Sequence, residues 1–134
     1  MSHSEETGHS SLLDKKVLED LRKLSADGHV NYLDRAISLY EKTSPQLVKS
    51  IHEAIARNEA QALFFAAHSL KSSSALLGAT SLSSLCLKLE NMGRNDAMHD
   101  AASLLQVLNE EFEGVLCALE QEKSGNHLED GMAH

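Results

Sequence analysis

Apolar residues recur at helical spacing along most of the chain. The clearest repeat runs from Ala101 to Leu119, where apolar residues follow one another at intervals of three and four. Similar repeats cover 17–24, 30–55, 63–77 and 82–92. This spacing places the apolar residues on one face of an α-helix, and no stretch resembles a strand. The pattern therefore predicts an all-α protein.

Local sequence signals suggest where these helices begin. Asp14 and Asp27 are predicted to cap the first and second helices, because an aspartate side chain accepts hydrogen bonds from free N–H groups at a helix start. Thr80 or Ser81 is expected to cap the fourth helix. Asp96 is expected to begin the last helix.

Pro45 interrupts the apolar repeat of residues 30–55. A proline inside a helix removes one backbone hydrogen bond and crowds the previous turn, which costs about 3 kcal/mol. One alternative is a second helix that starts at Ser44 with Pro45 in its first turn. Because the apolar phase is unbroken across the proline, we expect one bent helix.

The predicted helices are joined by short connections, and Gly78 supplies a stop for the third. Four helices of substantial length with short loops fold most simply as an antiparallel up-and-down four-helix bundle. A short extra N-terminal helix precedes it. We expect the bundle to span residues 13–121, with polar, disordered tails at 1–12 and 122–134.

Composition narrows the classes of function. The chain has 134 residues, of which 42% are hydrophobic, and this suits a single domain. Its net charge of −8 provides no basic surface for nucleic acid, and no apolar run approaches the roughly 18 residues of a membrane span. Without a signal-peptide pattern, a cytoplasmic location is expected. Cys86 and Cys117 occupy apolar helical positions and are predicted to be reduced core residues.

His68 lies off the apolar stripe of the third helix, which comprises Leu63, Ala66, Ala67, Leu70, Ser74 and Leu77. At about 100° per residue, its side chain points roughly 140° away from that stripe. Lys71 follows one turn later, and Ser72 and Ala75 are short enough to leave the imidazole unobstructed. An exposed nucleophile beside a cation suits a site that carries a phosphoryl group. A surface histidine beside a surface lysine is the plain alternative.

The segment 67–79 resembles the signature of histidine-containing phosphotransfer (HPt) domains, with His68, Lys71 three residues later and Gly78 ten residues later. The order and spacing of the predicted helices are also similar to that family. Most members have glycine after the lysine, whereas this chain has Ser72, which is still small.

The resemblance implies a phosphorelay intermediate. His68 would accept a phosphoryl group from an aspartyl phosphate on one response-regulator receiver domain and pass it to another, with a hybrid sensor histidine kinase as a further partner. Such a protein is a monomeric carrier without autonomous kinase activity or cofactor, since Mg²⁺ sits in the receiver. The chain also has no Gly-rich or Walker-type nucleotide motif.

Glu90 and two phenylalanines leave alternatives open. The resemblance implies that Glu90 hydrogen-bonds the His68 imidazole, whereas an ordinary solvated glutamate is equally compatible with the sequence. Phe65 and Leu76 project away from the apolar stripe and either pack under the first helix or form an exposed docking patch. Phe64 is the better candidate for partner contact because it precedes His68 by one turn. A second hypothesis is therefore a helical adaptor that binds partners through the Phe64/Phe65 surface.

The eight histidines raise the possibility of a metal site. A di-metal site in a helical bundle needs a Glu-x-x-His pair on each of two core helices. Glu6 and His9 are the one pair with that spacing, and they lie in the predicted tail. No metal site is expected.

Overall fold

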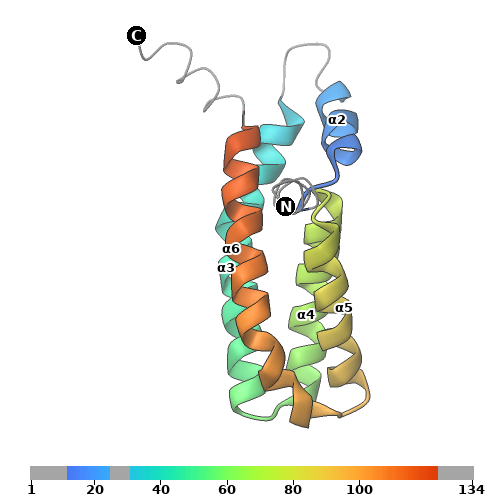
Figure 1. Cartoon of the computed structure of the whole chain (residues 1–134), viewed down its shortest axis with the longest axis vertical. Helices are drawn as coiled ribbons and strands as arrows, with labels where there is room; N and C mark the ends of the chain where they lie inside the picture. Colours follow the sequence, from blue (N-terminus) through green and yellow to red (C-terminus); the bar gives the residue numbers. More distant parts are fainter. Residues whose placement is uncertain (1–11, 25–30, 124–134) are drawn as a thin grey trace, which may run out of the picture.

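The computed structural model describes residues 12–24 and 31–123. Its elements in order are α2 (Lys15–Lys23), α3 (Tyr32–Ala56), α4 (Ala60–Leu76), α5 (Thr80–Arg94), the 3₁₀ segment η1 (Met98–Leu104) and α6 (Leu105–Glu122). The described residues contain no strand. Successive long helices run in opposite directions, and α2 lies at the end of the bundle where α4 meets α5 (Figure 1). The predicted all-α, antiparallel four-helix bundle with an extra N-terminal helix is confirmed. The predicted tails fall outside the described residues except at their inner edges.

The core forms along α4, which packs against both α3 and α5. Every residue of the predicted α4 stripe is buried. The polar member of the stripe, Ser74, shares a hydrogen bond of 2.7 Å with the hydroxyl of Tyr40 on α3, so both buried hydroxyls are satisfied. Burial raises the pKa of Tyr40 to about 12. None of the described helices combines the length and apolarity needed to cross a lipid bilayer.

Helix α3 continues through Pro45, as the unbroken apolar phase predicts. Pro45 is exposed, while the preceding Ser44 is buried and its hydroxyl donates to the carbonyl oxygen of Tyr40 at 2.5 Å. The proline therefore faces solvent, and the apolar positions on either side of it stay in one helix that packs on α4.

Two predicted helix starts lie near the N-terminus. Asp14 caps α2, and its side chain accepts from the backbone N–H of Lys16 at 3.0 Å, which confirms that prediction. Asp27 lies outside the described residues. Helix α3 is capped by Asn31, whose side chain accepts from the N–H of Asp34 at 3.0 Å.

The predicted cap of α5 is wrong. Thr80 is already the first helical residue, and the capping position belongs to Ala79, which makes no side-chain hydrogen bond. The buried Ala79 donates its N–H to the carbonyl of Ser74 at 2.9 Å, closing the turn that ends α4. Because only residues 77–79 connect α4 to α5, α5 begins two residues earlier than a Ser81 cap would allow.

The predicted start of the last helix at Asp96 is also wrong. Asp96 has φ = +55°, which lies outside the right-handed helical region. The chain then forms the 3₁₀ segment η1, which buries Ala101 against its neighbours, and α6 starts only at Leu105. Asparagine and aspartate tolerate a positive φ but are also favoured at helix N-caps, so the sequence does not distinguish these roles and the apolar repeat alone overestimates this helix.

The two cysteines differ. Cys86 is buried, and burial raises the pKa of its thiol to about 12, so it is an unreactive core residue as predicted. Cys117 is exposed on α6, and its predicted core position is wrong. Its neighbours Val115 and Leu119 occupy the buried face, which leaves Cys117 on the outward side of the helix.

Gly78 joins the bundle to the first helix. It has φ = +78°, and its carbonyl accepts from the N–H of Asp14 at 2.7 Å. A Cβ at this position would lie 2.9 Å from the carbonyl oxygen of Asp14. The turn therefore needs glycine both for its left-handed conformation and for the close approach of α2.

Gly78→Ala is expected to lower the free energy of unfolding by about 1–2 kcal/mol through backbone strain alone. The close contact with Asp14 adds to this cost. Chemical denaturation followed by circular dichroism measures the change. Coincident unfolding curves for the variant and the parent would show that the turn relaxes without strain.

Candidate functional site

His68 lies in the middle of α4 and faces outward, as its position off the apolar stripe predicts. Its side chain is 53% exposed. Ser72 and Ala75, on the following turns, are both exposed, so short side chains border the ring on this face. The imidazole is therefore open to an approaching reactant.

Glu90 projects from α5 toward His68 and is almost completely buried, with 2% of its side chain exposed. Its Oε2 lies 3.2 Å from Nδ1 of His68. Glu90 therefore contacts the His68 imidazole and is not a solvated side chain. Because a carboxylate only accepts hydrogen bonds, Nδ1 carries the proton and donates it, which leaves the lone pair on Nε2.

Lys71 provides the main counter-charge for Glu90. Its Nζ lies 2.7 Å from Oε1 of the carboxylate, and its side chain is 26% exposed. The interaction with Lys71 lowers the pKa of Glu90; burial opposes this effect and the hydrogen bond from His68 adds to it. Glu90 is therefore ionised at neutral pH despite its burial.

Arg94 is a third partner of Glu90, and the sequence interpretation missed it. Its Nη2 lies 3.1 Å from Oε2 of Glu90, and its Nη1 donates to Oδ1 of Asn91 at 2.9 Å. The available signal was the spacing of four residues between Glu90 and Arg94, which places oppositely charged side chains together on one helix face. That spacing is common on exposed helices, so it does not by itself identify a site.

Two phenylalanines lie beside His68. The Phe64 ring stacks on the imidazole with a centroid distance of 6.0 Å and an interplanar angle of 20°. The Arg94 guanidinium lies 5.3 Å from the Phe64 centroid. Phe65 is 57% exposed and meets Phe64 edge to face, so it does not pack under the first helix. Of the two alternatives for Phe65, the structure therefore supports the exposed position.

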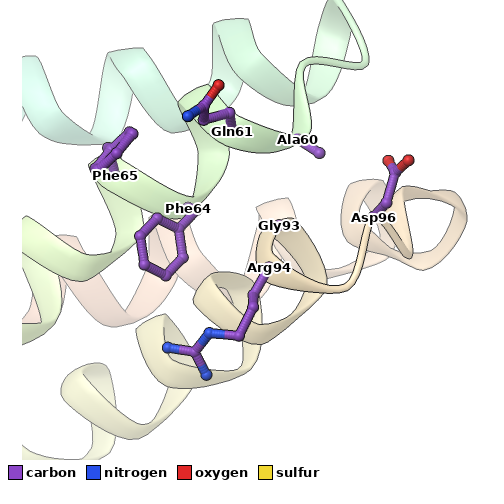
Figure 2. A pocket seen from close by; sticks show the side chains of 7 residues that line it. All are labelled: Ala60, Gln61, Phe64, Phe65, Gly93, Arg94 and Asp96. Carbon is purple, nitrogen blue, oxygen red and sulfur yellow. The ribbon is translucent and has the colours of Figure 1, made fainter.

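A pocket of about 400 Å³ opens next to these rings. We call it the Phe64 pocket; it lies between the start of α4 and the end of α5 (Figure 2). Gly93 allows α5 to approach α4 closely beside this pocket, because a Cβ there would lie 2.6 Å from the carbonyl oxygen of Ala60 and 2.7 Å from the backbone nitrogen of Phe64. The lining residues are Ala60, Gln61, Phe64, Phe65, Gly93, Arg94 and Asp96.

Metal chemistry has no visible basis in the part of the chain that the structure describes. No group of three or more histidine, cysteine, aspartate or glutamate side chains is close enough there to hold a metal ion. The Glu6 and His9 pair lies outside the described residues. Glu90, the buried carboxylate of this site, is instead surrounded by cations.

The site combines an exposed imidazole, a buried carboxylate that fixes its tautomer, and two cations. Predicted residues His68, Lys71 and Glu90 come together within hydrogen-bonding distance, and Phe64 joins them by stacking. Ser72 and Ala75 lie beside the ring without a described contact to it. Gly78 is ten residues away along the chain, at the turn that holds α2. The arrangement suits a nucleophilic nitrogen that accepts an anionic group.

Comparisons with known proteins agree with this chemistry. The family model described as Hpt domain matches residues 35–121. The solved structure of histidine-containing phosphotransfer protein B (HptB) from Pseudomonas aeruginosa PAO1 is similar, with a TM-score of 0.75 and 31% sequence identity. The match covers 83% of this chain and 93% of that chain. A comparison with curated proteins found no match.

Proposed function

Because the chain belongs to the Hpt domain family, and thus has a general role in histidine phosphotransfer, we propose that His68 is the residue that carries the phosphoryl group. The observation that supports this best is the His68–Glu90 pair. One ring nitrogen donates to a buried, ionised carboxylate at 3.2 Å, while the ring itself is half exposed. Among the described residues, this pairing offers a fixed and accessible nucleophile.

The proposed donor is an aspartyl phosphate on a receiver domain. The lone pair on Nε2 attacks phosphorus, an N–P bond forms, and the P–O bond to the aspartate carboxylate breaks with its electrons leaving on that carboxylate. The proton on Nδ1 remains in place, so the ring becomes a cationic phosphoimidazole. Glu90 stabilises that positive charge through the hydrogen bond it already makes. The reverse reaction delivers the phosphoryl group to a second receiver.

Lys71 is proposed to balance the charge of the phosphoryl group. The group adds close to two negative charges, as other phosphorylated side chains do near neutral pH. Lys71 is one helical turn from His68 and is held at Glu90, which also has Arg94 as a counter-ion. Arg94 can continue to neutralise Glu90 when Lys71 turns to the phosphoryl group. If Arg94 also turns away, the buried carboxylate still has the cationic phosphoimidazole ring as its hydrogen-bond partner.

The partners in this proposal are receiver domains, and a hybrid sensor histidine kinase is a further partner. The protein acts as a carrier without autonomous kinase activity. The second candidate is the helical adaptor, which the exposed Phe65 ring favours. In an adaptor, His68 would remain unmodified.

Incubation with an aspartyl-phosphorylated receiver domain tests the two functions. Transfer predicts phosphate on this protein that is labile in acid and stable in alkali, located on His68 by mass spectrometry. Binding of the receiver without such phosphate supports the adaptor. Absence of both with a panel of receivers contradicts the proposed role of His68.

Lys71→Ala is expected to slow phosphoryl transfer by about ten- to a few-hundred-fold without unfolding the protein. Opposite unit charges ~4 Å apart attract by roughly 1 kcal/mol in water and about 4 kcal/mol at a dielectric of ~20, and a site partly covered by a receiver lies between these limits. Initial transfer rates from one phosphorylated receiver measure the effect. Lys71→Arg keeps the charge but changes its shape and should be intermediate.

Lys88→Ala is the matched control, because it removes an exposed lysine from α5. Added salt should reduce the difference between Lys71→Ala and the parent, since exposed charges are screened over about 8 Å at physiological ionic strength. If Lys71→Ala and Lys88→Ala transfer equally fast at low salt, Lys71 has no role in the reaction.

A further inference from the structure

The Phe64 pocket shares two of its walls with the His68 site. The Phe64 ring stacks on the imidazole and also lines the pocket. Arg94 lines the pocket and bonds Glu90, the hydrogen-bond partner of His68. A group that enters the pocket therefore touches residues that contact the reactive ring and its carboxylate directly.

The pocket has the size and lining of a binding site. Its volume of about 400 Å³ falls within the range usual for ligand pockets, roughly 300–1,000 Å³. Phe64 and Phe65 provide an aromatic wall, and Phe65 remains 57% exposed at its edge. An aromatic surface of this kind favours an apolar side chain as occupant.

Charge divides the pocket into two ends. Figure 2 shows Asp96 beside Ala60 and the Arg94 guanidinium on the other side, next to the Phe64 ring. A guanidinium has five N–H donors, and the described contacts of Arg94 use its two terminal nitrogens at Glu90 and Asn91. Its side chain is 55% exposed, so it can accept a further anionic partner. The Arg94 end suits a carboxylate, while the Asp96 end disfavours one.

We propose that the Phe64 pocket is a docking site for the receiver domain that exchanges the phosphoryl group with His68. The occupant is an apolar side chain of the receiver with a neighbouring carboxylate directed at Arg94. This inference rests on the proposed function, because it takes the phosphoryl donor to be a protein that covers His68.

Docking at Arg94 also acts on the nucleophile. Oε2 of Glu90 is shared by Nη2 of Arg94 at 3.1 Å and Nδ1 of His68 at 3.2 Å. When a receiver carboxylate draws Arg94 into the pocket, Arg94 no longer bonds Oε2 of Glu90, and His68 keeps its hydrogen bond to that oxygen. The hydrogen bond to Nδ1 then strengthens, which raises the electron density available at Nε2. Receiver binding thus prepares the ring for attack.

Another exposed apolar surface lies between α3 and α4, where a groove of about 90 Å³ is bordered by Leu39 and Leu76. These side chains are 60% and 63% exposed. Leu76 follows His68 by two helical turns, and none of the residues that line this groove has a described contact with His68 or Glu90. The Phe64 pocket is larger and adjoins the reactive group, so it is the better placed of the two.

The test compares two phosphoryl donors. One is a purified, aspartyl-phosphorylated receiver domain that transfers to the parent protein. The other is phosphoramidate, a small donor that releases ammonia on transfer and needs no protein docking site. The measured quantity is the ratio of the two initial rates for Phe65→Ser, Arg94→Gln, Leu76→Ser and Val107→Ser. Val107→Ser is the matched control, since it removes a 45%-exposed apolar side chain from α6.

Phe65→Ser is expected to lower the receiver-to-phosphoramidate ratio at least tenfold, mainly through a higher KM for the receiver. Arg94→Gln should lower the ratio further, and Val107→Ser should leave it at the parent value. The docking proposal would be overturned if Phe65→Ser and Val107→Ser gave the same rate ratio, or if only Leu76→Ser lowered it. Either result would place the receiver elsewhere. Failure of the parent to take phosphate from either donor would instead overturn the proposed function itself.

Discussion

His68→Gln is expected to abolish phosphoryl uptake while changing the free energy of unfolding by no more than about 1 kcal/mol. Glutamine has no nucleophilic ring nitrogen, so no N–P bond can form. The half-exposed His68 side chain contributes little packing, and Glu90 keeps its ion pairs with Lys71 and Arg94. Uptake is measured as acid-labile phosphate after incubation with a phosphorylated receiver, and stability by thermal unfolding.

His52→Gln is the matched control for this experiment. His52 lies on α3 and bonds Asn109 of α6 at 2.8 Å, away from the candidate site. The His52→Gln variant should take up phosphate at the same rate as the parent protein. Residual uptake by His68→Gln would place the phosphoryl group on another residue, and a large fall in its thermal stability would contradict the outward position of His68.

Gly93→Ala is expected to destabilise the bundle by about 3 kcal/mol, which corresponds to a fall in Tm of roughly 10 °C for a domain of this size. The added methyl group would meet backbone atoms of α4 at 2.6 and 2.7 Å, and backbone cannot rotate away as a side chain does. Helix α5 must therefore move away from α4. Since Glu90 and Arg94 lie within a turn of Gly93, phosphoryl transfer should slow as well.

Gly114→Ala provides the control, because a Cβ there would lie 3.3 Å from the flexible end of the Leu12 side chain. Alanine has the higher helix propensity by nearly 1 kcal/mol, so this variant should be as stable as the parent or more stable. Thermal unfolding and transfer rates compare the two variants. Equal stability of Gly93→Ala and Gly114→Ala would mean that α4 and α5 separate at little cost.

Much of the fold is encoded locally and could be predicted. The apolar stripe of α4 is buried along its whole length, and the Asp14 cap forms as expected. The errors occur where backbone conformation depends on neighbouring elements. Ala79 is the N-cap of α5 because a tight turn precedes it. Asp96 has a positive φ, so the 3₁₀ segment η1 follows it and α6 starts only at Leu105.

The part of the candidate site that lies on a single helix, α4, was predictable. His68 and Lys71 are neighbours on α4 by spacing alone, whereas Glu90 reaches them only because α5 packs on α4. The sequence therefore left open whether Glu90 is solvated. The position of Arg94 and the Phe64 pocket depend on the same packing, in which Gly93 allows the close approach of α5 to α4. Sequence spacing cannot report such contacts between helices.

The cluster around Glu90 also affects how partners approach. Lys71 and Arg94 together outweigh the single carboxylate, so the site carries one net positive charge on a chain of net charge −8. The net negative charge of the chain repels an acidic, phosphorylated partner, while this cluster attracts it locally. The electrostatic field of the cluster extends over roughly 8–10 Å in physiological salt, so it orients the partner before contact. The charge pattern thus selects the orientation of the encounter complex, and ionic strength should act chiefly on the association rate.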